Sequence, residues 1–178
     1  MTVIRDPETQ RGVKVNEEGE LVTRAIAEPE IEHASSLGNA YAWFSPTQDV
    51  VAGGTLLFIK NLGDTPLILD RMRVIGGNVA STYTIHLGKL TTTPDTINIT
   101  GTNLNPRFGD EADVHATANE TALADGTTVE IFQQPATISE EYNLAGIILT
   151  KGVYIQINQE TESTAGAVVI YGHFENPA

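Results

Sequence analysis

Short segments of alternating apolar and polar residues, separated by turn residues, constrain the fold of this chain more than any other feature. They run from residue 55 almost to the C-terminus, with Gly, Pro, Asn or Asp between them. Such alternation is typical of half-buried strands, whereas the repeat of an amphipathic helix is nearly absent. The sequence predicts strands at 55–61, 66–75, 81–87, 96–101, 112–119, 127–133, 144–150, 153–158 and 165–175.

The spacing of these segments, about ten residues, indicates a β-sandwich or a barrel. We expect an all-β protein with an antiparallel β-sandwich, in which a jelly roll is the favoured topology. An immunoglobulin-like sandwich is the main alternative, but its cysteine pair is missing. Two regions are predicted: an extended N-terminal arm with a short strand (20–25) and a linker over 1–36, and the sandwich over 37–178.

Some segments allow finer predictions. Residues 28–36 are acidic and are expected to be irregular, and residues 37–54 are expected to form a loop. The Ala-rich segment 112–119 would also suit a helix, but its alternation favours a strand. Within 127–133 we expect Val129 and Ile131 to face inward. Segment 165–175 is apolar on both faces, which predicts a central strand packed on each side.

Composition excludes several classes of protein. The 178 residues include no Cys, which removes disulfide scaffolds, Cys-based zinc sites and thiol nucleophiles. The net charge of −13 argues against nucleic acid as the main partner, because phosphate binding needs a basic face. No secretory signal and no run of about 20 apolar residues is present, so we expect synthesis in a cytoplasm and no membrane partner.

The charge is unevenly distributed. Residues 90–178 carry 12 acidic and two basic side chains, a net charge of −10. Residues 1–15 carry Arg5, Arg11 and Lys14 against two acidic residues, a net charge of +1. Such asymmetry can mark an interaction arm, although three bases in fifteen residues can also be without function.

A search for catalytic chemistry finds little. The four histidines, at 33, 86, 115 and 173, are far apart in sequence, and neither a cupin-type His pair nor a Gly-x-Ser-x-Gly motif occurs. We expect each histidine to be an ordinary surface or half-buried residue. The acidic segment 110–113 could hold calcium but lacks the loop pattern of a calcium site. We therefore predict no enzyme, no cofactor, no metal and no catalytic residue.

Three aromatic residues fall close together at Tyr41, Trp43 and Phe44. One interpretation is that they close one end of the sandwich. Another is that they anchor an interface, where Trp and Tyr are enriched. A third is that they form a platform on which a sugar stacks.

A resemblance bears on the choice of function. It is carried by residues 6–15 (DPETQRGVKV), 16–25 (NEEGELVTRA), 32–35 (EHAS), 40–43 (AYAW) and the strand 55–61 with 64–67 (DTPL). Together they resemble structural proteins of tailed-bacteriophage virions, of the kind that decorate or cement the capsid.

The resemblance implies a β-sandwich body, an N-terminal arm that binds the major capsid protein, frequently a homotrimer, and no catalysis. It places the protein on the capsid exterior of the virion, with Arg5, Arg11 and Lys14 as the expected arm contacts. The alternative is a carbohydrate- or receptor-binding jelly-roll module of a phage head or tail fibre. That alternative would use the aromatic residues around Trp43.

Overall fold

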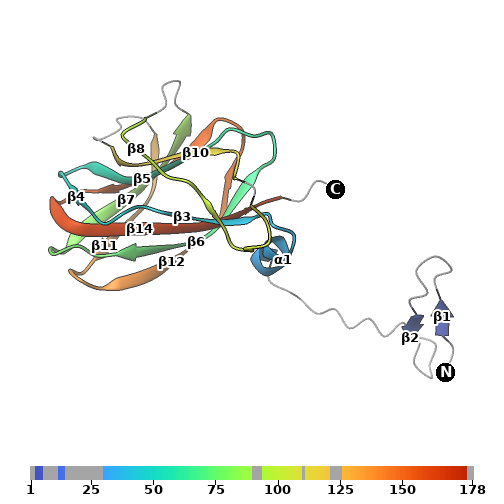
Figure 1. The fold of residues 1–178 in the computed structure, drawn as a ribbon. Helices are drawn as coiled ribbons and strands as arrows, with labels where there is room; N and C mark the ends of the chain where they lie inside the picture. The colour runs from blue at the N-terminus through green and yellow to red at the C-terminus, as the bar shows by residue number, and fades with distance from the viewer. Residues whose placement is uncertain are drawn as a thin grey trace.

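Two antiparallel sheets packed face to face make up the body of the protein (Figure 1). The computed structural model describes residues 3–5, 12–14, 30–89, 94–109, 111–120 and 126–175. Within these residues nearly all regular structure is β, which confirms the predicted all-β sandwich. No helix in this part of the chain is long and apolar enough to cross a membrane.

Each large sheet is built mainly from strands that are distant in sequence. The first has the order β11 (Thr127–Gln134), β7 (Ser81–Lys89), β13 (Val153–Gln159), β5 (Gly54–Asn61), β10 (Val114–Glu120) and β8 (Ile97–Asn98). The second has the order β12 (Ser139–Leu149), β6 (Leu67–Ile75), β14 (Ser163–Phe174), β3 (Ala40–Phe44) and β9 (Thr102–Asn103), with β4 (Gln48–Val50) also paired to β14.

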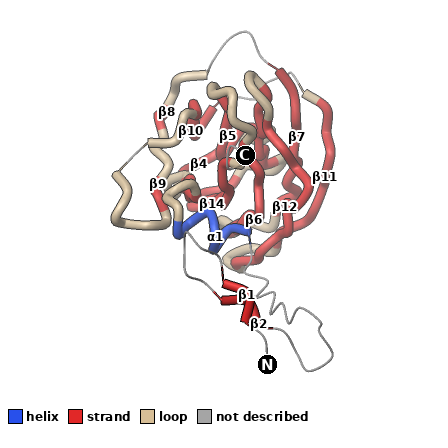
Figure 2. The backbone as a smooth tube through the Cα atoms, turned by 90° about the vertical axis from the view of Figure 1, so that its right-hand side faces the viewer, coloured by secondary structure: helices blue, strands red, loops and turns tan. Residues whose placement is uncertain are grey.

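The chain changes sheet at most of its connections. Strands β5, β6 and β7 alternate between the two sheets, and so do β11, β12, β13 and β14. A third, two-stranded sheet is formed by β1 (Val3–Arg5) and β2 (Gly12–Lys14), which pair with each other and belong to neither large sheet. The single described helix, α1 (Glu30–Ser36), packs against β3 and β14 (Figure 2).

The core lies between the two large sheets and is dominated by aliphatic and aromatic side chains. Burial of such side chains supplies the main favourable free energy of folding. Phe132 stacks between two tyrosines, with ring centroids 5.5 Å from Tyr83 and 4.0 Å from Tyr142. The largest fully buried side chains are Trp43, Tyr83, Tyr154, Phe58, Leu56, Leu57, Ile59, Leu67, Leu69, Met72, Ile85 and Leu149.

Two predictions for residues 28–54 are wrong. Residues 28–36 are not irregular throughout, because Glu30–Ser36 forms α1. Its acidic residues suit the positive end of a helix, and Ala34 is buried against the sheet. Residues 37–54 are not a plain loop, because they contain β3 and β4. The predicted strand at 20–25 lies outside the described residues.

The inward placement of Val129 and Ile131 is also wrong, since their exposed fractions are 45% and 61%. The ladder between β11 and β7 shifts register between Thr128 and Glu130. Such a bulge changes which residues face the core. Phe132 packs inward instead: it is partly buried and stacks on the core residue Tyr83.

Other predictions are confirmed. Segment 112–119 contains a strand, β10, which pairs with β5 from Val114↔Asn61 to Glu120↔Thr55. The apolar last segment is a central strand, because β14 pairs with β6 on one side and β3 on the other. The strand predicted at 96–101 is shorter than expected, with only Ile97–Asn98 in β8.

Candidate ligand groove

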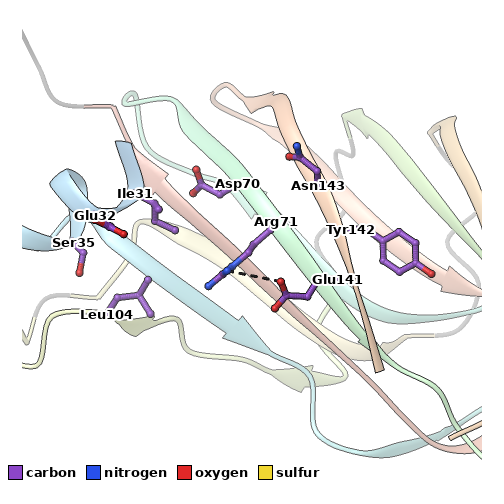
Figure 3. Close-up of a pocket in the computed structure, with 9 residues that line it drawn as sticks. All are labelled: Ile31, Glu32, Ser35, Asp70, Arg71, Leu104, Glu141, Tyr142 and Asn143. Atoms are coloured by element: carbon purple, nitrogen blue, oxygen red, sulfur yellow. Dashed lines mark ion pairs between the residues drawn. The ribbon is translucent and has the colours of Figure 1, made fainter. Parts of the chain in front are cut away.

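A groove of about 620 Å³ lies between α1 and the outer face of the second sheet (Figure 3). We call it the α1 groove. Its walls come from α1, β6, β12 and the segment after β9. The residues that line it are Ile31, Glu32, Ser35, Asp70, Arg71, Leu104, Glu141, Tyr142 and Asn143.

An irregularity in β6 places two consecutive charged residues at this groove. In the pairing with β14, Tyr171 lies opposite Arg71 and the next residue, Gly172, lies opposite Leu69. The pairing with β12 likewise omits Asp70. Asp70 is therefore the extra residue of a bulge, and the alternation of β6 reverses there. Both Asp70 and Arg71 can then line the groove on the outer face.

Arg71 is held by an aromatic ring and a carboxylate. Its guanidinium carbon lies 4.6 Å from the centroid of the Tyr171 ring, a cation–π contact. Its Nη1 lies 3.9 Å from Glu141 Oε2, and both side chains are about half exposed. A pair of this kind contributes less than about 1 kcal/mol to stability. Its value lies in presenting a positioned guanidinium to the groove.

Asp70 is fixed by a histidine beneath the groove. The ring of His173 donates from Nδ1 to Asp70 Oδ2 at 3.0 Å, and His173 is only 5% exposed. A buried, paired histidine differs from the surface or half-buried residue that was expected. A carboxylate on Nδ1 is also the arrangement that orients the histidine of a hydrolase triad. The pair links β14 to β6 at the groove.

Tyr142 lines the groove from its position on β12, but its ring points away from the other lining residues (Figure 3) and packs on Phe132. Its hydroxyl donates to Gln134 Oε1 or Glu140 Oε2, each at 2.9 Å. Burial, followed by the hydrogen bond to Glu140 and the charge of that carboxylate, raises the pKa of Tyr142 to about 12. The phenol therefore stays neutral near neutral pH.

Three carboxylates and one guanidinium at a half-open groove can bind a polar, hydroxyl-rich ligand. They do not form a metal centre: no cluster of three or more His, Asp or Glu side chains that could hold a metal ion occurs within the described residues. Glu111 and Asp113 from the acidic segment 110–113 border a different, smaller pocket of about 250 Å³.

Two of the predicted arm residues, Arg5 and Lys14, lie on the small two-stranded sheet. Arg5 ends β1 and lies opposite Gly12, and Lys14 ends β2 and lies opposite Val3. Arg11 lies outside the described residues. The register thus brings Arg5 and Lys14 onto one small unit that is separate from the two large sheets.

The three aromatic residues lie on strand β3 rather than on a loop, and they do not form one exposed surface. Tyr41 and Trp43 point into the core, with 5% and 0% exposure, while Phe44 is half exposed. Tyr41 packs on Trp43, with ring centroids 5.9 Å apart, and edge-on against Phe174. Trp43 is therefore a core residue and offers no face on which a sugar could stack.

The remaining histidines are scattered over the fold. His86 contacts the hydroxyls of Thr84 and Thr128, and His115 lies 2.6 Å from the carbonyl of Pro94. His33 is on α1. The four histidines therefore do not converge.

Sequence reasoning missed the residues that line the α1 groove. One signal was present, because Leu67 and Leu69 alternate on one parity while Met72 and Val74 alternate on the other. A change of parity inside one strand indicates a bulge, and bulges often place functional side chains. The approach of α1 and β12 to this position had no comparable signal.

Comparison with known proteins adds no identity: no family model, no curated protein and no solved structure matches this chain.

Proposed function

We propose that the protein is a structural virion protein that binds the outside of a phage capsid through its N-terminal segment and stabilises or decorates the shell. The sandwich, interpreted more finely as jelly-roll-like, is then the displayed body. The major capsid protein is the partner, and self-association would multiply the weak contacts of each arm.

The observation that carries the proposal is the contrast in charge between residues 1–15, with a net charge of +1, and the body. Residues 30–178 hold 17 acidic and six basic side chains, a net charge of −11. The bases Arg5 and Lys14 instead end two short strands that pair only with each other. A body with strong negative charge stays soluble and avoids DNA, while a basic segment can dock on an acidic surface.

The test is binding of the purified full-length protein to heads of the phage that carries its gene, purified without this protein. Cosedimentation should give saturable binding. Triple charge reversal, Arg5→Glu with Arg11→Glu and Lys14→Glu, should weaken that binding by at least about tenfold, because each lost contact is worth about 0.5–1 kcal/mol or more.

A matched control reverses three exposed bases of the body: Lys89→Glu, Arg107→Glu and Lys151→Glu. It changes the net charge by the same amount at a different place. The proposal requires that this control bind like the unmodified protein. Equal losses in both variants would indicate non-specific attraction, and full binding by the first variant would overturn the role of the arm.

The α1 groove favours a second candidate function, a carbohydrate- or receptor-binding module. Its Asp70, Arg71, Glu141 and Asn143 are the kinds of side chain that hold sugar hydroxyls. Because Trp43 is buried, such a module would bind at the groove and not at the aromatic residues of β3.

A glycan array tests this candidate. Any positive glycan should lose binding with Arg71→Ala or Asn143→Ala, while Arg107→Ala, an exposed arginine outside the groove, should leave binding unchanged. An array without positives, on a protein shown to be folded, would remove the candidate.

A further inference from the structure

The four outer edges of the two large sheets are protected to very different degrees. Exposed edge strands can pair with other chains, and proteins usually shorten them, charge them or interrupt them. Among the described strands, β8 and β9 are edges of only two residues each. The third edge, β12, carries Glu140 and Glu141, and its pairing is interrupted between Asn143 and Ile147.

The fourth edge, β11, has none of these devices over most of its length. It has eight residues with no Lys, Arg or Pro and a single charge, Glu130. Its residues from Thr127 to Ile131 are all exposed, and the exposed fraction of Ile131 is 61%. Its one irregularity, at Thr128 to Glu130, leaves the half from Glu130 to Gln134 in regular register with β7.

The lack of charge indicates what would pair with this edge. A partner strand should carry few charges, because Glu130 is the single charged side chain of β11 and a charge opposite any other position would lose solvent without finding a partner. Residues 1–29 of the chain itself fit poorly, since they hold six acidic and four basic side chains. A second copy of β11 fits, because it brings Thr, Val, Ile, Phe and Gln against the same set.

We propose that β11 pairs antiparallel with β11 of a second copy, around a two-fold axis at Ile131. In an antiparallel ladder, directly opposite residues form hydrogen-bonded and non-hydrogen-bonded pairs in alternation. A two-fold axis that relates two identical strands passes through the centre of one such pair, so one residue lies opposite its own copy. An axis at Glu130 would oppose two carboxylates. An axis at Ile131 places Glu130 opposite Phe132 of the second copy and brings together the two copies of Ile131, the most exposed apolar side chain of the strand.

This pairing joins the β11-containing sheet of one copy to the same sheet of the second copy, so that they form one continuous sheet. It goes beyond capsid binding and does not depend on it, because residues 1–29 take no part. Each chain carries a charge of −13, so repulsion opposes the dimer and added salt should strengthen it.

The test uses the full-length protein in sedimentation velocity over a concentration series in 0.3 M salt, a value of our choosing at which the Debye length is only about 6 Å. The unmodified protein should reach the mass of two chains. Ile131→Lys should raise the dimer dissociation constant by at least about tenfold, because it sets two ammonium groups opposite each other. Ile97→Lys is the matched control, since Ile97 is an exposed isoleucine on β8, at the other edge of the same sheet, and it should leave the mass unchanged.

A cysteine test checks the register. The chain has no Cys, so a single introduced thiol gives an unambiguous disulfide. Ile131→Cys should form a linked dimer under mild oxidation, whereas Gln133→Cys, which the register places opposite Val129 of the second copy, should link far less. Circular dichroism checks that every variant is folded.

A folded protein that stays monomeric throughout the series would overturn the proposal, and so would an Ile131→Lys variant with an unchanged dissociation constant. A mass of three chains would overturn the two-fold pairing, because a three-fold contact joins two different surfaces. None of these results affects capsid binding, which the arm variants test separately.

Discussion

Gly172 shows how one backbone position supports the bulge under the α1 groove. A Cβ atom added there would lie 2.6 Å from the backbone oxygen of Ile68, which has no freedom to move away. Gly172→Ala should therefore lower the free energy of unfolding by about 1–3 kcal/mol, the usual range for overpacking. Urea titration followed by circular dichroism measures the change.

Gly109 provides the control for this substitution. No atom lies within 4 Å of a Cβ added at Gly109, and its backbone does not need a positive φ. Gly109→Ala should stay within about 0.5 kcal/mol of the unmodified protein. Equal effects at the two sites would contradict the crowding seen at Gly172.

Tyr142 predicts how stability changes at alkaline pH. Its pKa is raised from 10.0 in the unfolded chain to about 12 in the folded protein, mainly by burial. The contribution of the neutral phenol is fully present below pH 10 and is lost as the pH rises from 10 toward 12. Melting temperatures between pH 8 and 11 should fall less steeply for Tyr142→Phe than for the unmodified protein. Parallel curves would contradict the raised pKa.

At the scale of single elements, β3 divides two neighbouring aromatic residues between core and surface. Trp43 is fully buried and Phe44 is half exposed. Trp43→Ala should cost about 3–5 kcal/mol, as large core truncations do, and Phe44→Ala less than about 1 kcal/mol. Urea unfolding followed by circular dichroism compares them. A larger loss of stability for Phe44→Ala than for Trp43→Ala would contradict the burial of Trp43.

The strands that could be predicted are those with one dominant pattern. β5, β6, β7, β13 and β14 combine alternation with clear turn residues, and the sequence locates both ends of each within two residues. The failures at residues 28–36 and 37–54 concern short elements whose formation tertiary contacts decide. α1 has seven residues, too few for a periodic signal, and it is stabilised by packing on β3 and β14.

At the scale of the whole molecule, the candidate site was less predictable than the fold. Asp70 and Arg71 follow each other in the sequence, but the groove also needs Glu32, Glu141 and Leu104 from three other segments. Their convergence depends on which strands neighbour which, and alternation along a strand does not determine that order.

The acidity of the whole body gives a further prediction. Its net charge of −11 means that repulsion acts against the compact state, and salt screens that repulsion within about a Debye length. Raising sodium chloride from 10 mM to 500 mM, two concentrations chosen for the test, should raise the melting temperature by a few degrees, about what 1 kcal/mol or less produces. A lower melting temperature at high salt would mean that attractive ion pairs dominate.

The position of β13 and β14 in their sheets also fixes when the body can form. β13 lies between β7 and β5, and β14 lies between β6 and β3, yet both come after every strand they pair with. A ribosome that has made the first 150 residues holds a chain in which each sheet lacks a middle strand. Pairs such as β5 with β10 and β6 with β12 can already form, but the strand edges that receive β13 and β14 stay open until residue 174 has left the exit tunnel. Open edges of this kind expose the unfinished chain to aggregation.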